Sequence, residues 1–234
     1  MKNIVYLFVM ICLPSCIYAQ NDMYEISFEP FCRIDSLIVN EMVYSKANNV
    51  FVLKGDEGDA VINDKGDCIY KGYIDENKYK TLNIPFLAGN IITGLFQEET
   101  RLSNLMVERA EYKLLTNNDF AAYCIVLDSV FKERTPNGHI GKIDNEGFVH
   151  LFAFLCGEAS GLCCSNEDLW YLYKSQNNDK TGYIRRYNLE NGIKTQTVKV
   201  NVSDPKGLVY INGFLYTYSN KDHYLYIFDT SSYD

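Results

Sequence analysis

The chain has 234 residues, of which 47% are hydrophobic and 14% aromatic, and its formal net charge is −8. The apolar content excludes a disordered chain. The acidic balance argues against a nucleic-acid partner, because neutralising phosphates requires clustered Lys and Arg. The chain is rich in tyrosine, and aromatic residues suit the half-buried surfaces of β-strands.

The first predicted element is a secretory signal peptide over residues 1–19. Lys2 supplies a positive charge, residues 4–13 form an apolar run, and Ala19 ends a small-residue cleavage site. The run is shorter than the roughly 20 apolar residues that a membrane-spanning helix needs. We therefore expect a protein exported to the periplasm, the cell surface or the medium, with residues 20–234 forming a single domain.

Two other interpretations of this segment stay open. Residues 13–16 read Leu-Pro-Ser-Cys and resemble a bacterial lipobox, in which the cysteine, here Cys16, becomes lipidated. Pro14 is a poor match to that motif. Lipidation would tether the protein to a membrane, whereas cleavage after Ala19 would release it. The other alternative is that the apolar run stays attached as a membrane anchor.

Six cysteines remain after cleavage, and an even number in an oxidising compartment permits disulfides. The alternative is that several are buried free thiols that pack as small hydrophobic groups. Their spacing does not match a CxxC-type zinc site, so we expect neither a metal nor a cofactor. These cysteines are Cys32, Cys68, Cys124, Cys156, Cys163 and Cys164.

Short apolar runs separated by turns rich in Asn, Asp or Gly dominate the chain, and they predict β-hairpins. Such turns need positive φ angles or local side-chain hydrogen bonds, which these residue types supply. Repeated hairpins indicate an all-β meander. The predicted hairpins cover residues 43–53, 60–70, 142–154 and 187–200, with turns at 47–49, 63–66, 144–147 and 188–192.

One stretch departs from this pattern. Residues 100–115 carry apolar positions at helical spacing, including Leu102, Leu105 and Met106, with Thr100 or Ser103 as a cap. We expect a short helical insertion or an irregular sheet there.

Two segments look like copies of one unit. Residues 161–173 and 207–218 both begin with Gly-Leu, continue as an apolar strand, turn, and continue as an aromatic strand. Gly161 and Gly207 are about 46 residues apart, and a period of 40–50 residues with four strands is typical of propeller blades. The segments 43–74 and 120–134 fit the same template. Stacking of such units around a ring would supply the core.

On these features the chain resembles bacterial exported β-propeller repeat proteins of the NHL-like and quinoprotein-like kind. The resemblance covers about two-thirds of the mature chain and implies a propeller. At about 40 residues per blade, the mature chain would form about five four-stranded blades. No catalytic motif accompanies it. The last predicted strand ends where a further hairpin would turn. Either an N-terminal strand within residues 24–40 completes that blade and closes the ring, or the array of blades stays open.

Few residues suggest chemistry. The three histidines have no metal-ligand spacing, and no nucleophile elbow is present. An acidic cluster surrounds two turns. It would form a calcium site or a pair of carboxylates for glycoside hydrolysis; the alternative is that these side chains are solvated at the tips of two hairpins. Its members are Asp56, Glu57, Asp59, Asp64 and Asp67.

Aromatic side chains are the remaining candidates for a ligand site, because they would form a platform for a sugar or peptide; the alternative is packing between blades. The candidates are Trp170, Tyr171, Tyr173, Tyr216 and Tyr218. We therefore predict a non-enzymatic exported binding module whose ligand is a glycan or a protein or peptide. The alternatives are a glycoside-active enzyme that uses paired carboxylates on the same scaffold, and a truncated propeller without independent activity.

Overall fold

The structure is a computed structural model, and its described part is built from β-strands. It describes residues 24–45, 48–74, 110–117, 122–128, 138–143, 149–154, 157–175 and 180–233. The predicted signal peptide and Cys16 lie outside these residues. One short 3-10 turn, Thr230–Tyr233, follows the last strand. Within the described ranges no helix is long and apolar enough to cross a membrane.

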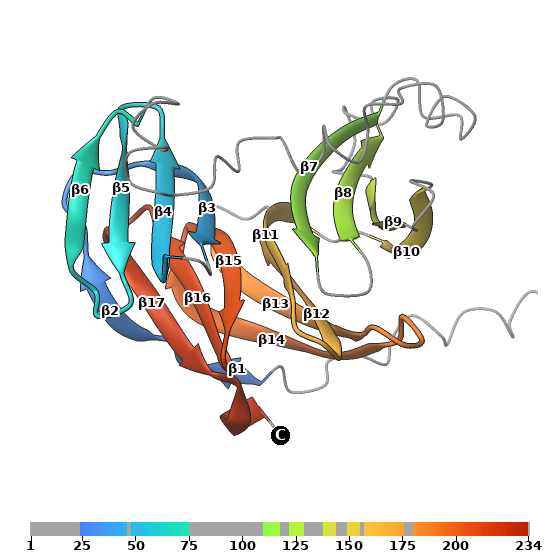
Figure 1. Ribbon diagram of the computed structural model, residues 1–234. Coiled ribbons are helices and arrows are strands. Elements are labelled where there is room, and N and C mark those ends of the chain that lie inside the picture. The colour runs from blue at the N-terminus through green and yellow to red at the C-terminus, as the bar shows by residue number, and fades with distance from the viewer. Residues whose placement is uncertain are drawn as a thin grey trace, which may run out of the picture.

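The strands form four sheets, each with four antiparallel strands in up-and-down order, and one sheet carries a fifth, parallel strand at its edge (Figure 1). Blade 1 contains β3 (Val39–Ser45), β4 (Val50–Gly55), β5 (Gly58–Asn63) and β6 (Cys68–Gly72). Blade 2 contains β7 (Ala110–Asn117), β8 (Ala122–Asp128), β9 (Gly138–Ile143) and β10 (Val149–Phe154). The predicted hairpins at 43–53, 60–70 and 142–154 are confirmed by these pairings.

Blades 3 and 4 come from the two repeated segments. Blade 3 contains β11 (Glu158–Cys164), β12 (Asp168–Lys174), β13 (Thr181–Asn188) and β14 (Lys194–Ser203). Blade 4 begins with β15 (Pro205–Ile211), β16 (Phe214–Ser219) and β17 (Tyr224–Asp229). The repeat is confirmed, because residues 161–173 and 207–218 both fall on the first hairpin of a blade.

The N-terminal segment supplies the strand that blade 4 lacks. Strand β2 (Glu29–Arg33) pairs antiparallel with β17 and becomes the outer strand of blade 4. Strand β1 (Glu25–Ile26) pairs parallel with β14 on the outer edge of blade 3. The chain then enters blade 1. Completion of the last blade by an N-terminal strand is confirmed, and residues 24–39 connect three blades.

The first strands of the blades lie next to one another on the inside, in the order β7, β11, β15, β3. The repeated glycines permit this approach. A Cβ on Gly161 of β11 would lie 2.6 Å from Leu208 of β15, and a Cβ on Gly207 of β15 would lie 2.4 Å from the Cβ of Met42 in β3. The Gly-Leu rhythm of the sequence therefore marks the positions where consecutive inner strands touch. This radial arrangement of up-and-down sheets is a β-propeller fold.

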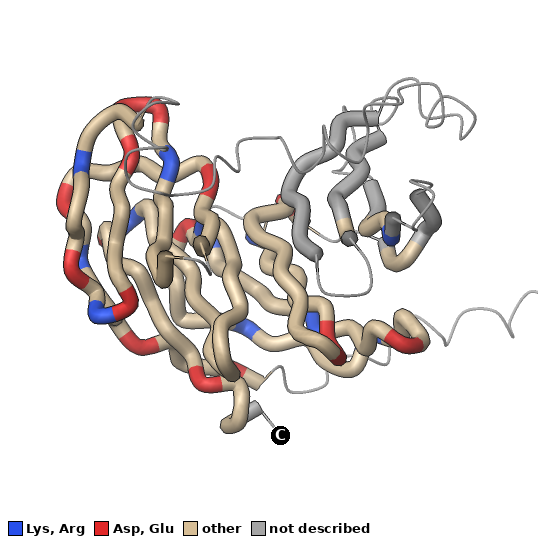
Figure 2. The backbone as a smooth tube through the Cα atoms, in the orientation of Figure 1, with Lys and Arg blue, Asp and Glu red and all other residues tan. Residues whose placement is uncertain are grey.

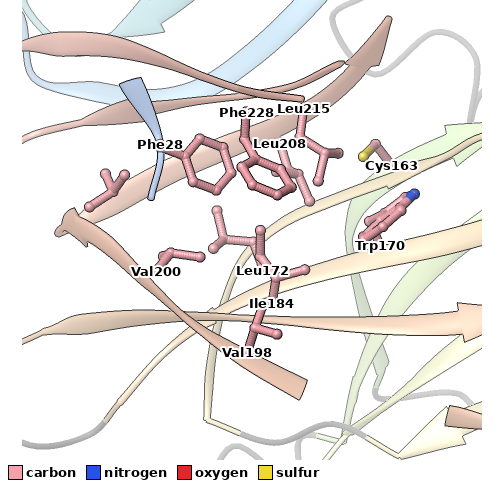
Figure 3. Close-up of a cluster of buried hydrophobic side chains, with 11 residues drawn as sticks. Phe28, Cys163, Trp170, Leu172, Ile184, Val198, Val200, Leu208, Leu215 and Phe228 are labelled. Atoms are coloured by element: carbon pink, nitrogen blue, oxygen red, sulfur yellow. The ribbon is translucent and has the colours of Figure 1, made fainter. Parts of the chain in front are cut away.

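Apolar side chains fill the seams between blades. The 3/4 seam is centred on Trp170, Leu172 and Leu208, with Phe28 reaching in from the N-terminal segment (Figure 3). The 4/1 seam contains Phe51, Tyr218 and other residues of blades 1 and 4. Since neighbouring blades cover both faces of a sheet, strand β12 is buried at every position.

Two expectations change. A helix over 100–115 is wrong for residues 110–115, which lie in β7 and pair with β8; cross-strand hydrogen bonding overrides the helical spacing there. Residues 100–109 lie outside the described residues. The predicted count was about five blades, and the described residues form four. Residues 75–109, between β6 and β7, are not among them.

Candidate functional site

The candidate site is a group of charged side chains on the face where the inner strands begin, called here the start face. Lys174 ends β12 directly opposite Glu158, which begins β11. Asp204 is the single residue between β14 and β15, so it links blade 3 to blade 4. Lys206 follows on β15, and Lys180 precedes β13. These five residues are called the lysine cluster.

Lys174 is the centre of the lysine cluster. Its Nζ lies 2.8 Å from Asp204 Oδ1 and 3.2 Å from Glu158 Oε1, and its side chain is 5% exposed. Lys180 Nζ lies 3.3 Å from the other carboxylate oxygen of Asp204. Trp170, Leu172 and Lys174 occupy alternate positions of β12 and therefore share one face. The cluster thus covers the start-face end of the 3/4 seam.

Burial and charge act in opposite directions on these groups. Burial of the Lys174 ammonium would lower its pKa, but its hydrogen bonds and attraction to Asp204 and Glu158 prevail and raise it. Burial would likewise raise the pKa of Asp204, but Lys174 and Lys180 lower it. Both groups are therefore held in their charged forms.

Lys206 has a different environment. Burial and the neighbouring Lys174 ammonium lower its pKa, against the weaker attraction of Glu158 and Asp204. Among the described residues, Lys206 makes no ion pair with a carboxylate. The cluster therefore holds three ammonium groups and two carboxylates. An anionic group from a ligand would supply the missing partner of Lys206.

The five predicted aromatic residues do not meet on one surface. Trp170 packs in the 3/4 seam and Tyr218 in the 4/1 seam, and both are buried. Tyr171 and Tyr173 are buried between blades 2 and 3, where their rings stack with centroids 5.5 Å apart. Tyr216 is half-buried against Phe51, with centroids 4.8 Å apart. This burial supports packing between blades as their role, and ligand binding by them stays a prediction.

The acidic residues near the predicted turns make local hydrogen bonds. Asp56 accepts one from the Asn40 side chain at 2.6 Å, Asp59 accepts one from the Ile74 backbone N–H, and Asp67 accepts one from Asn63. Across the described ranges, no group of three or more His, Cys, Asp or Glu side chains is placed to hold a metal ion. The arrangement fits solvated hairpin tips.

A second polar group lies on the start face at the 4/1 seam. The Tyr218 hydroxyl lies 3.0 Å from the Leu37 carbonyl and 3.2 Å from the Ile34 carbonyl. The Asn220 side chain accepts from Val39 N–H at 2.8 Å and donates to Val39 C=O at 2.9 Å. His223 Nδ1 contacts the Leu37 carbonyl at 3.1 Å. These contacts hold residues 34–39, which connect β2 to β3, and leave His223 engaged in structure.

The lysine cluster did not emerge from the sequence. Its signal is a charged residue at a position where the alternation of β12 demands burial, namely Lys174 after Trp170 and Leu172. A buried ammonium needs a carboxylate, which a search for motifs alone does not locate. Figure 2 shows charged residues of both signs interspersed along the described chain, without a continuous basic stripe.

No protein-family model matches this chain, and no curated protein matches it significantly. Solved structures similar to it include the Dos1 propeller, with TM-score 0.39 and 10% identity over 82% of this chain and 45% of that chain. The nidogen/laminin complex gives TM-score 0.42 and 9% identity over 87% and 65%. AztD from Citrobacter koseri gives TM-score 0.38 and 12% identity over 84% and 45%.

The chain therefore spans less than two-thirds of the length of each of these three structures. The similarities are weak, so the assignment of a β-propeller depends on the chain's own strand order, register and seams.

Proposed function

We propose that this chain is an exported, non-enzymatic binding module that takes a protein or peptide ligand on the start face, where Lys206 receives a ligand carboxylate. The observation that carries the proposal is the lysine cluster, in which a half-buried ammonium stands beside a second ammonium that is already paired. Groups whose pKa is shifted by burial and by a neighbouring charge cluster at functional sites.

Peptides suit this site better than sugars. A sugar ring binds on an exposed aromatic face, and four of the five candidate aromatics are buried in seams. A peptide offers the carboxylate of Asp, Glu or its own C-terminus, and an ammonium group binds such a carboxylate through a charge-assisted hydrogen bond. The connections between blades would contact the remainder of the ligand, because loops at the ends of a rigid scaffold commonly carry binding.

The alternative of a glycoside-active enzyme has one observation in its favour. Glu158 and Asp204 both lie within 3.2 Å of the same Nζ, so two carboxylates are close together. A glycosidase needs one of its two carboxyl groups protonated as the acid, with a raised pKa. Lys174 lowers the pKa of Asp204, which opposes that role. The binding module therefore remains the preferred proposal.

The experiment is to probe purified mature protein on a peptide array containing acidic and neutral sequences, beside a glycan array and a glycoside hydrolysis screen. We expect binding to carboxylate-bearing peptides and no turnover. Lys206→Gln should weaken this binding at least tenfold, roughly the value of one charge-assisted hydrogen bond. The matched control is Lys65→Gln in the exposed turn between β5 and β6, which should bind like the unmodified protein.

Three outcomes would overturn the proposal. Equal binding by Lys206→Gln and the unmodified protein would exclude the lysine cluster as the site. Binding to glycans and to no peptide would show that the ligand is a glycan rather than a protein or peptide. Release of sugar products by the unmodified protein, lost in Asp204→Asn and Glu158→Gln, would establish the enzyme.

A further inference from the structure

The outer strand of blade 1 runs beside the closing strand of blade 4. A Cβ on Gly66, in the turn before β6, would lie 3.3 Å from Cys32 Cβ and 3.5 Å from the Phe31 carbonyl oxygen. At the other end of β6, Lys71 Nζ donates a hydrogen bond to the Asp35 carbonyl. Residues 66–71 therefore follow residues 32–35 along the same stretch of surface.

This alignment brings two cysteines from distant parts of the sequence together. Cys68 stands two residues after Gly66 and three before Lys71, so along the chain it lies between the two contacts that join this stretch to residues 31–35. The two thiols are close enough that Cys68 contributes to raising the pKa of Cys32. Both are free thiols in the structure; Cys68 is exposed and Cys32 is half-buried.

We propose that Cys32 and Cys68 form a disulfide that covalently joins the closing strand of blade 4 to the outer strand of blade 1. The oxidant is a small disulfide such as oxidised glutathione. The Cys68 thiolate attacks it, forms a mixed disulfide and releases one glutathione thiolate. The Cys32 thiolate then attacks the Cys68 sulfur and expels the second. Overall, two cysteine thiols and one oxidised glutathione give one protein disulfide and two reduced glutathiones.

Exposure determines the order of these steps. Cys68 is exposed and meets the oxidant first, because access and thiolate character govern exchange. Burial, together with the neighbouring Cys68, raises the pKa of Cys32 to about 11, and a backbone hydrogen bond from Leu225 opposes this. The closing step should therefore quicken as the pH rises from 7 to 9, since more of Cys32 is then ionised.

Two cysteines of blade 3 serve as an internal comparison. Cys163 and Cys164 are neighbours on β11, where successive side chains point to opposite faces of the sheet. Cys163 is buried in the 3/4 seam. Burial also raises the pKa of Cys163, and this limits its exchange with an oxidant.

The test is to incubate the purified mature protein with oxidised glutathione, block remaining thiols with an alkylating agent and digest with trypsin without reduction. We expect one cross-linked species joining the peptide that ends at Arg33 to the peptide of residues 66–71, and it should disappear on reduction. The oxidised protein should melt roughly 5–10 °C higher than the reduced protein, since a disulfide constrains the unfolded chain.

Two variants make the result decisive. Cys68→Ser changes an exposed residue, so it should fold normally, lose the cross-link and lose the rise in Tm. Cys164→Ser should retain both. A stable glutathione adduct on Cys68, or a Cys32 thiol that remains open to alkylation after unfolding of the oxidised protein, would overturn the proposal. The result is independent of ligand binding and therefore does not depend on the proposed function.

Discussion

The two best-described seams of this propeller are closed by different chemistry at the start face. In the 3/4 seam, an ammonium and two carboxylates cover the apolar core, and an Asp168–Arg186 ion pair at 2.8 Å lies at the opposite end of β12. In the 4/1 seam, neutral hydrogen bonds from Tyr218 and Asn220, together with a contact from the His223 ring, hold the residues that lead into β3.

The difference follows the path of the chain. Blades 3 and 4 are consecutive and are joined by the single residue Asp204, so covalent connection already positions them. Blades 4 and 1 come from opposite ends of the described chain, and residues 24–39 run from blade 4 into blade 1. That segment must be placed by directed hydrogen bonds, and neutral partners achieve this without the desolvation cost of ions. Asn201 holds the same segment on blade 3, where it bonds both N–H and C=O of Phe28.

The largest expected effect comes from removing the closing segment. Deletion of residues 1–33 removes β2, the buried ring of Phe28, which contributes about 1.5–3 kcal/mol by burial, and the half-buried ring of Phe31. We expect loss of cooperative unfolding in thermal circular dichroism, with partial recovery on addition of a synthetic peptide of residues 24–39. Deletion of residues 1–23 is the control and should melt normally. A normal melt for the longer deletion would show that the segment does not close the fold.

Replacing one buried aromatic side chain in each seam by alanine compares the stability of the 4/1 and 3/4 seams. Phe51→Ala in the 4/1 seam and Trp170→Ala in the 3/4 seam should each lower the free energy of unfolding by about 3–5 kcal/mol. Denaturant titration followed by tyrosine fluorescence and circular dichroism measures both, because Trp170 is the single tryptophan of the chain. If the propeller unfolds as one unit, the two probes should coincide for either variant. Separate transitions for Phe51→Ala alone would indicate that the 4/1 seam opens independently.

The side chains of Asn220 and Asn201, which each bond a backbone N–H and C=O of the N-terminal segment, should stabilise the fold by similar amounts. Asn220→Ala and Asn201→Ala each leave one backbone N–H and one C=O without a side-chain partner, at a cost of about 1–3 kcal/mol. Denaturant titration measures the loss, with Asn166→Ala in the exposed β11–β12 turn as a control expected to change little. Destabilisation by only one of these two substitutions would show that the segment is anchored on one blade only.

The lysine cluster makes the stability of the 3/4 seam sensitive to pH. Because the pKa of Asp204 is lowered in the folded state, its stabilisation is present above its unfolded pKa of 3.8 and is lost as the pH falls through the folded pKa. Because the pKa of Lys174 is raised, its contribution is present below 10.5 and is lost as the pH rises through the folded pKa. Asp204→Asn should cost about 1–2 kcal/mol at pH 7.

The difference in the free energy of unfolding between Asp204→Asn and the unmodified protein should disappear below pH 3.8, as measured by denaturant titration. Asn220→Ala provides the contrast. Its cost should hardly vary between pH 4 and 9, because burial raises the pKa of the neighbouring Tyr218 and keeps the hydroxyl protonated there. A pH-independent cost for Asp204→Asn would show that the ions contribute nothing to the seam.

The smallest effect concerns Lys206. Because its pKa is lowered on folding, the charged side chain slightly disfavours the folded state at neutral pH. Lys206→Met should therefore leave the free energy of unfolding unchanged or raise it by up to about 1 kcal/mol, while abolishing binding of acidic peptides. Differential scanning calorimetry with a peptide titration measures both. Destabilisation by more than 1 kcal/mol would assign Lys206 a structural role instead.

Much of the fold was accessible from sequence because its signals are local. Turns rich in Asn and Gly define the hairpins, and the spacing of Gly161 and Gly207 defines the repeat. The structure adds the reason for that glycine, which is contact with the next inner strand. Strand β7 was missed because its pairing with β8, rather than its own residue spacing, determines its conformation.

The candidate site was less accessible, because it depends on which blade covers each face. Alternation correctly places Tyr171 and Tyr173 on one face of β12 and Trp170 on the other. It does not reveal that blades 2 and 4 bury both faces. Lys174 follows the same alternation, yet its partners Asp204 and Glu158 lie 30 and 16 residues away.

Hydrogen exchange of the unmodified protein tests the closure of blade 4 most directly. We expect amides of β2 that pair with β17 to be protected as strongly as those of β15 and β16, whereas the two-residue edge strand β1 should exchange quickly. Exchange of the β2 and β17 amides at the rate of an unstructured chain would contradict the closure of blade 4 by β2.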